Sequence, residues 1–195
     1  MAQRATLELV ASSPKRDASH RHDLAYPAAL RQLARSVSVV TFQRGADWFG
    51  LTATSLSSLS VDPPTILLSF DGAASLSQAG AQARFGVSVL AASHAEIADR
   101  FGRGALVEAS SDDFEGSWVT AASGVALRSD AVAAFECESE EIIVRHGRAI
   151  VIGRIRNVFR IGGSGALVYW HGAYNSIGWT DDEVRRAVGL FPAAR

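Results

Sequence analysis

Hydroxyl side chains are concentrated in one short segment of the chain, residues 52–58, which directly follows a predicted strand. Five of its seven residues are Thr or Ser, and the small side chains leave backbone N–H groups open to a ligand. Hydroxyls and backbone amides can hydrogen-bond the edges of planar heterocycles and the oxygens of phosphate groups. The competing interpretation is a Ser/Thr-rich turn whose hydroxyls satisfy the neighbouring backbone. Residue types and spacing leave both interpretations open.

The other candidate motifs for catalysis or nucleotide binding are incomplete. Residues 102–104 (Gly-Arg-Gly) follow a predicted helix and lack the third glycine of a Rossmann site. The sequence contains neither a phosphate-binding P-loop nor a G-x-S-x-G nucleophile elbow. The single cysteine, Cys137, lies in an apolar strand, and we interpret it as an inert core residue. His20 and His22 have no third ligand nearby in the sequence, so we expect no metal site.

Composition and charge narrow the class of protein. The 195-residue chain is 48% hydrophobic and 20% charged, which is typical of one compact globular domain. A formal net charge of -1 and the lack of a dense Lys/Arg run argue against a nucleic-acid partner. No apolar run reaches the ~18–20 residues of a membrane-spanning helix, and the N-terminus lacks a secretory signal. A lone cysteine permits no intrachain disulfide, so we expect a cytoplasmic protein.

The hydrophobic periodicity predicts a mainly β fold with short helices. Alternating or β-branched runs predict strands over residues 37–42, 48–53, 65–70, 85–89, 131–144, 148–160 and 166–170. Apolar periodicity or capping boxes predict helices over residues 24–35, 75–83 and 93–101, and another that starts near residues 180–183. Turns are predicted at residues 44–47, 146–147 and 162–165, and a long loop with partial helix over residues 102–130.

These elements together favour a β-barrel with helices at its openings. The regular helix between strand pairs, which a doubly wound fold needs, is missing. Pro63 and Pro64 belong at the start or edge of a strand because proline cannot donate to a sheet. The carboxylates of residues 136–141 are interpreted as the solvated face of a strand and not as an acid–base pair. Residues 1–23 are predicted to be a flexible tail and residues 24–195 a single domain.

Several ordered motifs resemble those of the flavin reductase family, whose members include reductase components of two-component flavin-dependent monooxygenases. They are residues 50–55 (Gly-Leu-Thr-Ala-Thr-Ser), 57–64 (Ser-Ser-Leu-Ser-Val-Asp-Pro-Pro), 85–90, 134–137, 150–153 and 167–174. The resemblance implies an FMN-binding split β-barrel, a homodimer, and a flavin held at the barrel rim. It also implies an NAD(P)H-dependent flavin reductase that supplies reduced FMN or FAD to a partner monooxygenase, with NADH or NADPH as the hydride donor.

The resemblance also implies which residues hold the flavin. Residues 52–55 would face the isoalloxazine and ribityl chain, Ser57 and Ser58 the ribityl and phosphate region, and His171 and Tyr174 the flavin face. Asp71, Gly72, Ser75 and Ser77 would complete a phosphate cradle at a helix N-terminus. In full, the implied cofactor-binding residues are Thr52, Ala53, Thr54, Ser55, Ser57, Ser58, Asp71, Gly72, Ser75, Ser77, Arg148, His171 and Tyr174.

The sequence departs from the family pattern at two positions. Arg148 stands where relatives often have a histidine that is associated with nicotinamide docking, so Arg148 could instead pair with a phosphate of the nicotinamide cofactor. Ser88 stands where an asparagine is usual.

The mechanism needs orientation more than side-chain chemistry. Nicotinamide C4 would donate hydride to flavin N5 while the protein aligns the two rings, so we expect no catalytic acid or base. Two alternatives stay open: a flavin- or haem-binding split-barrel protein without rapid turnover, and a stand-alone flavin-dependent oxidase.

Overall fold

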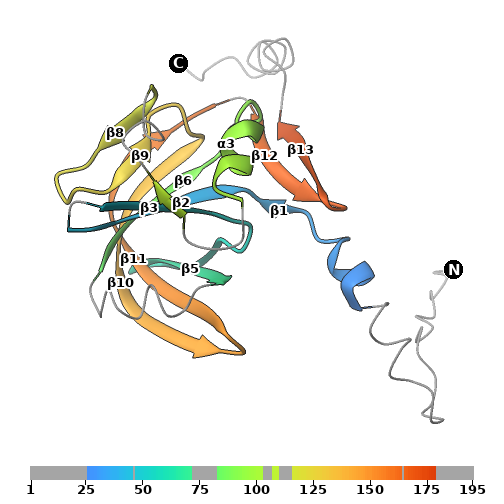
Figure 1. The fold of residues 1–195 in the computed structure, drawn as a ribbon, viewed down its shortest axis with the longest axis horizontal. Helices are drawn as coiled ribbons and strands as arrows, with labels where there is room; N and C mark the ends of the chain where they lie inside the picture. The colour runs from blue at the N-terminus through green and yellow to red at the C-terminus, as the bar shows by residue number, and fades with distance from the viewer. Residues whose placement is uncertain are drawn as a thin grey trace, which may run out of the picture. The chain divides into compact units, whose positions relative to one another are not determined.

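The computed structural model describes residues 26–45, 47–71, 83–102, 107–109, 116–163 and 165–178, which are drawn in colour in Figure 1. The chain divides into two compact units, Met1–Leu33 and Ala34–Arg195. In the first unit, residues 26–30 are helical, which confirms the central part of the helix predicted over residues 24–35. The predicted tail, the body of the helix predicted over residues 75–83, and the helix predicted near residues 180–183 lie outside the described residues.

Antiparallel strands make up most of the second unit. One sheet has eight strands in the order β4-β5-β11-β10-β6-β2-β3-β7. Their bounds are β2 (Ser38–Arg44), β3 (Asp47–Ala53), β4 (Ser57–Val61), β5 (Pro64–Asp71), β6 (Arg84–Val89), β7 (Val107–Ala109), β10 (Ala133–Arg145) and β11 (Arg148–Ile161). A second sheet joins β1 (Arg35–Ser36), β12 (Gly165–Trp170) and β13 (Ala173–Gly178), and a hairpin joins β8 (Trp118–Thr120) to β9 (Ala126–Arg128). A mainly β fold with short helices is confirmed.

Strand β2 separates two hydrophobic clusters because its alternate residues point to opposite faces. Val40 and Phe42 belong to the larger cluster, where the rings of Phe42 and Phe85 lie 5.8 Å apart. Val39 belongs to a second cluster with Phe101, at the end of the short helix α3 (Ala95–Arg100). Each such side chain contributes about 1.5–3 kcal/mol on full burial. The second cluster, which also contains Ala98, packs α3 against the sheet.

The predicted hairpin turns are confirmed. His146 and Gly147 have φ of 51° and 76° and connect β10 to β11 as a two-residue turn. Gly45, with φ of 63°, lies in the turn between β2 and β3. Pro64 is the first residue of β5, as its missing N–H requires.

Six strands were missed or misassigned. The prediction of a long loop with partial helix over residues 102–130 was wrong, because β7, β8 and β9 lie there, and three-residue strands are too short to show alternation. Strand β4 replaces a predicted polar connection, since its side chains lie at an exposed sheet edge. The side chains of strand β13 are nearly all exposed, so its sequence shows no alternation of apolar and polar residues. Strand β1 ends the predicted N-terminal helix early, because Arg35 and Ser36 pair with β12.

The carboxylates of β10 form a solvated face only in part: Glu140 and Glu141 are exposed as expected, but Glu136 and Glu138 are not. Glu136 is only 4% exposed, and its carboxylate accepts a hydrogen bond from Asn157 Nδ2 at 2.5 Å. Glu138 pairs with Arg84 and Arg156, at 3.0 Å in both cases. This face of β10 is therefore a paired polar surface and not a simply solvated one. Two β-bulges on either side of Glu136 account for the error, since each bulge breaks the alternation of faces.

Cys137 is buried in the larger cluster, and burial raises the pKa of its thiol to about 12. The interpretation of Cys137 as an inert core residue is confirmed. In the part of the chain that the structure describes, no helix is long and apolar enough to cross a membrane.

Candidate flavin-binding pocket

A pocket of about 450 Å³ lies where β3, α3 and the β12–β13 hairpin come together, a size typical of small-molecule sites. Its described lining residues are Thr52, Thr54, Asp99, Gly102, Tyr169, Gly172, Ala173 and Tyr174. The pocket thus brings together three of the sequence-predicted site residues, Thr52, Thr54 and Tyr174. Thr54 and Tyr174 are 120 residues apart in the sequence.

Thr52 joins β3 to the C-terminal end of α3. Its backbone N–H donates to the Phe101 carbonyl at 2.9 Å, and its hydroxyl donates to the Ala98 carbonyl at 2.8 Å. Carbonyls at a helix C-terminus have no partner within the helix, so these bonds satisfy groups that would otherwise need water. Gly50 permits the close approach, because a Cβ there would lie 2.6 Å from the Phe101 ring.

Two tyrosines form one wall of the pocket. Tyr169 on β12 and Tyr174 on β13 are cross-strand partners whose rings meet edge to face with centroids 5.6 Å apart. Burial raises the pKa of Tyr174, and the charges of Asp99 and Tyr169 raise it further. The Tyr174 hydroxyl therefore stays protonated and can donate a hydrogen bond.

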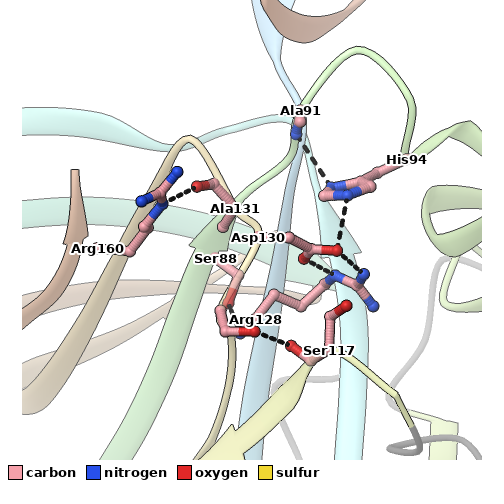
Figure 2. Close-up of polar contacts among 9 residues, drawn as sticks. Ser88, Ala91, His94, Ser117, Arg128, Asp130, Ala131 and Arg160 are labelled. Carbon is pink, nitrogen blue, oxygen red and sulfur yellow. Dashed lines mark hydrogen bonds and ion pairs between the residues drawn. The ribbon is translucent and has the colours of Figure 1, made fainter. Parts of the chain in front are cut away.

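The N-terminal end of α3 is held by a polar network around His94, shown in Figure 2. His94 Nδ1 accepts a hydrogen bond from the Ala91 N–H at 3.1 Å, and Nε2 lies 3.3 Å from Asp130 Oδ2. Arg128 donates two hydrogen bonds to the same carboxylate, at 2.8 and 2.5 Å. Burial lowers the pKa of His94 and outweighs the opposing effect of Asp130, so the ring is neutral with Nε2 protonated.

This network corrects one sequence-based expectation. The helix predicted over residues 93–101 is confirmed, but its capping box at Ser93 is wrong, because His94 occupies the N-cap without a side-chain cap bond. Ser88, at the position where asparagine is usual, belongs to the same network and is not among the described lining residues of the pocket. Its buried hydroxyl accepts a hydrogen bond from the Arg128 N–H at 3.0 Å.

The network reaches the other end of α3 through aromatic contacts. The Arg128 guanidinium lies 5.3 Å from the centroid of the Trp118 ring, and Trp118 meets Phe101 edge to face at 6.1 Å. Both ends of α3 are therefore fixed, and with them the positions of Asp99 and Gly102 on the pocket wall.

A second group of predicted residues gathers around Ser69 and not around the pocket. Ser55 Oγ donates to the Ser69 carbonyl at 2.6 Å and accepts from the Ser69 N–H at 2.8 Å. For Ser55, the interpretation of a hydroxyl that satisfies neighbouring backbone is the one the structure supports. Arg148 is paired with Asp71 at 2.7 Å, and its Nε lies 3.4 Å from Ser69 Oγ. Both charged side chains are exposed.

The remaining predicted residues have varied surroundings. Ala53 is buried in the larger hydrophobic cluster, and Ser57 and Ser58 are exposed on β4. His171, with φ of 53°, lies in the turn between β12 and β13 beside the pocket-lining Gly172, and its ring packs on Trp170. Gly72, Ser75 and Ser77 lie outside the described residues.

Sequence reasoning missed five of the described pocket residues: Asp99, Gly102, Tyr169, Gly172 and Ala173. Asp99 and Gly102 lie at the end of a predicted helix, and nothing in the sequence links that helix end to Thr52. Tyr169 could have been found, since it lies two residues before His171 on a predicted strand. Among the described residues, no three His, Cys, Asp or Glu side chains gather as a metal site.

Comparisons with known proteins agree with this architecture. Residues 30–178 match the family model described as the flavin reductase like domain. FMN reductase (NADH) RutF of Bradyrhizobium diazoefficiens is 29% identical over 157 residues, which cover 80% of this chain and 86% of RutF.

Two solved structures are similar throughout the barrel. BorF, the flavin reductase component of a bacterial two-component tryptophan halogenase, has 29% identity and a TM-score of 0.70, covering 81% of this chain and 99% of BorF. The Streptomyces globisporus NADH:FAD oxidoreductase SgcE6, in complex with NAD and FAD fragments, has 25% identity and a TM-score of 0.68, covering 87% of this chain and 99% of SgcE6. The expected split-barrel fold is confirmed, and the chain belongs to the flavin reductase family.

Proposed function

We propose that this protein is an NAD(P)H-dependent flavin reductase that supplies reduced FMN or FAD to a partner monooxygenase. The observation that carries the proposal is the pocket between β3, α3 and the β12–β13 hairpin, inside a domain that matches the flavin reductase family. The names of RutF, an NADH-dependent FMN reductase, and SgcE6, an NADH:FAD oxidoreductase, support the reaction class. BorF, the flavin reductase component of a two-component tryptophan halogenase, supports a separate partner enzyme that uses the reduced flavin.

The pocket residues fit a planar, hydrogen-bonding ring. Tyr169 and Tyr174 offer aromatic surface, and the Thr52 oxygen keeps lone pairs free after its own bond to Ala98. The protonated Tyr174 hydroxyl supplies a donor. These groups would bind and orient the ring, and the fixed ends of α3 would keep the wall in place.

When both ligands are bound, hydride passes from nicotinamide C4 to flavin N5, and the two cofactors supply this redox chemistry themselves. No side chain of the protein has to accept or deliver a proton in that step. The protein contributes alignment of the two rings and a wall that limits the access of water.

The phosphate groups of the bound cofactors would lie beside the second group of predicted residues, the one around Ser69. Ser57, Ser58, Asp71 and Arg148 lie on β4, β5 and β11, and Gly72, Ser75 and Ser77 follow β5 in the sequence. Arg148 provides a permanent cation with a planar fork of donors, which suits phosphate oxygens. Asp71 holds this cation at the strand end, where a phosphate could displace the carboxylate.

We place the enzyme in the cytoplasm as a homodimer. The lone cysteine suits a reducing compartment. Val158, Phe159 and Ile161 at the end of β11 are 52%, 48% and 80% exposed. Strand β5 pairs with β11 only as far as Arg154, so among the described residues the last part of β11 has one unpaired edge. An apolar open edge of this kind favours a second copy of the chain, since C2 dimers are the commonest oligomers.

A steady-state assay tests the reaction. Purified protein is given FMN or FAD with NADH or NADPH, in all four combinations, and loss of reduced nicotinamide is followed by absorbance. In at least one combination, the reduced nicotinamide should be consumed faster than in an enzyme-free control. Binding of flavin without reduction would favour a flavin-binding protein, and turnover that requires an added organic substrate would favour a stand-alone oxidase.

A further inference from the structure

Asp99 gives the pocket a negative charge. Among the described residues that line the pocket, it is the one side chain with a formal charge. Its charge acts on another lining residue, because it adds to the effect of burial in raising the pKa of Tyr174. A ligand ring in this pocket would therefore lie within the field of a carboxylate.

The backbone that carries this exposed side chain is held on both sides. Thr52 bonds the carbonyls of Ala98 and Phe101, one on each side of Asp99 in the chain. At the N-terminal end of the helix, the His94–Asp130 contact holds α3 to the β9–β10 connection (Figure 2). Since the aspartate side chain is short, its carboxylate stays close to this fixed segment of backbone.

A fixed negative charge distinguishes the two redox states of a flavin. The isoalloxazine ring is neutral when oxidised, whereas reduced flavin loses its N1 proton near neutral pH and becomes an anion. Like charges in a partly desolvated site repel, and charge near N1 is one of the means by which proteins tune flavins. We propose that Asp99 makes this pocket bind oxidised flavin more tightly than reduced flavin, so that the reduced product is released.

The inference rests on the proposed function, since it assumes that the pocket binds a flavin. It adds a direction to that function: the substrate form is retained and the product form leaves. By linkage, a preference for the oxidised form also means that the bound flavin has a lower reduction potential than it would have without Asp99. Release of the reduced form suits an enzyme whose product is consumed by a separate oxygenase.

The test compares Asp99→Asn with the wild type. Asparagine keeps the size of the side chain and removes its charge. Dissociation constants are measured for oxidised FMN, and anaerobically for FMN reduced chemically beforehand, at about pH 8 where the reduced ring is anionic. We expect Asp99→Asn to tighten binding of reduced FMN about tenfold relative to oxidised FMN. An effect of this size is typical of removing one like charge near a partly solvated site. A tenfold change corresponds to a rise of about 30 mV in the two-electron potential of the bound flavin.

Two controls separate charge from other effects. Glu96→Gln removes the same charge from the first turn of the same helix, away from the pocket lining, and should leave the ratio of the two constants unchanged. At about pH 6, where more of the reduced ring is neutral, the Asp99→Asn effect should shrink. A merely structural role for Asp99 would weaken both redox forms alike at either pH.

The outcomes also separate this inference from the proposed function. An unchanged ratio of dissociation constants in Asp99→Asn, with both redox forms bound by the wild type, would overturn the role of Asp99 alone. The same shift in Glu96→Gln would overturn it as well, because the effect would then be one of overall charge. If neither form of flavin binds the wild type, the proposed function fails.

Discussion

At the scale of single residues, the pocket depends on side chains that have both a structural and a ligand-binding role. Thr52 donates its hydroxyl proton to Ala98 and still offers oxygen lone pairs to a ligand. Ser55, only three residues on, uses its hydroxyl both to donate to and to accept from the Ser69 backbone. The sequence shows both as members of one Ser/Thr cluster, and only the backbone partners distinguish them.

The first prediction concerns Thr52. Thr52→Val keeps the shape of the side chain but leaves the Ala98 carbonyl without its partner, which costs about 1–3 kcal/mol. Because the same change removes an oxygen from the pocket, we expect the dissociation constant for FMN to rise about tenfold. Fluorescence titration measures the constant. Thr120→Val, at an exposed position on β8, is the control and should leave FMN affinity as it is.

The second prediction concerns Arg148. If its guanidinium contacts a phosphate of the nicotinamide cofactor, Arg148→Ala removes a charge-assisted hydrogen bond, and the nicotinamide KM should rise about tenfold or more. Stability should change little, since an exposed ion pair such as that with Asp71 contributes about 0–1 kcal/mol. Steady-state kinetics decide the matter, with Arg145→Ala on the same hairpin as a control. An unchanged KM would leave Arg148 as a solvated surface residue, and a selective loss of flavin affinity would assign it to the flavin phosphate.

At the scale of elements, α3 is the part of the fold that completes the site. Six residues are too few to form a stable helix alone, so its position depends on contacts at both ends. The N-terminal contact is the neutral ring of His94, whose Nδ1 must stay unprotonated to accept from Ala91. Asp130 and Arg128 are the charged groups that face this ring.

The third prediction follows from the lowered pKa of His94. The unfolded chain, with a His pKa of roughly 6.5, binds a proton more readily than the folded one. The contribution of His94 to stability is therefore present when the pH is above the pKa of the unfolded chain, and it is lost as the pH falls below that value. For one proton, the free energy of unfolding falls by less than about 1.4 kcal/mol per pH unit. Thermal unfolding of the wild type should show a lower Tm at about pH 5.5 than at about pH 7.5. In His94→Gln the difference in Tm between the two pH values should be smaller. An equal difference would show that His94 does not cause the pH dependence.

The elements also show how far a sequence can predict this structure. The β2–β3 and β10–β11 hairpins follow from β-branched runs on either side of the turns at Gly45 and Gly147. Strands β4 and β13 carry no such pattern, since edge strands bury little. Asp99 could not be linked to Thr52, because a helix end meets a strand end only through tertiary hydrogen bonds.

At the scale of the whole molecule, the open end of β11 is the feature that an isolated chain leaves exposed. Its unpaired edge and apolar side chains favour association with a second copy. Association would also cover Val158, Phe159 and Ile161, which a monomer leaves in water.

The fourth prediction concerns this assembly. Light scattering at micromolar concentration should give about twice the 20.7 kDa of one chain. Phe159→Glu should shift the protein towards monomer, because a buried unpaired carboxylate opposes association. Val119→Glu, an equally exposed apolar position on β8, is the matched control and should remain a dimer. A wild type that is monomeric at that concentration would contradict the assembly.

The most direct test of the central claim is an anaerobic single-turnover experiment in a stopped-flow instrument. Enzyme with one equivalent of FMN or FAD is mixed with excess NADH or NADPH, and flavin and nicotinamide absorbance are recorded together. Flavin reduction and nicotinamide oxidation should proceed at one rate and in equal amounts, faster than in the mixture without enzyme, for at least one pair of cofactors. Flavin that is bound but reduced no faster than in free solution, with all four pairs, would contradict the assignment of this protein as a flavin reductase.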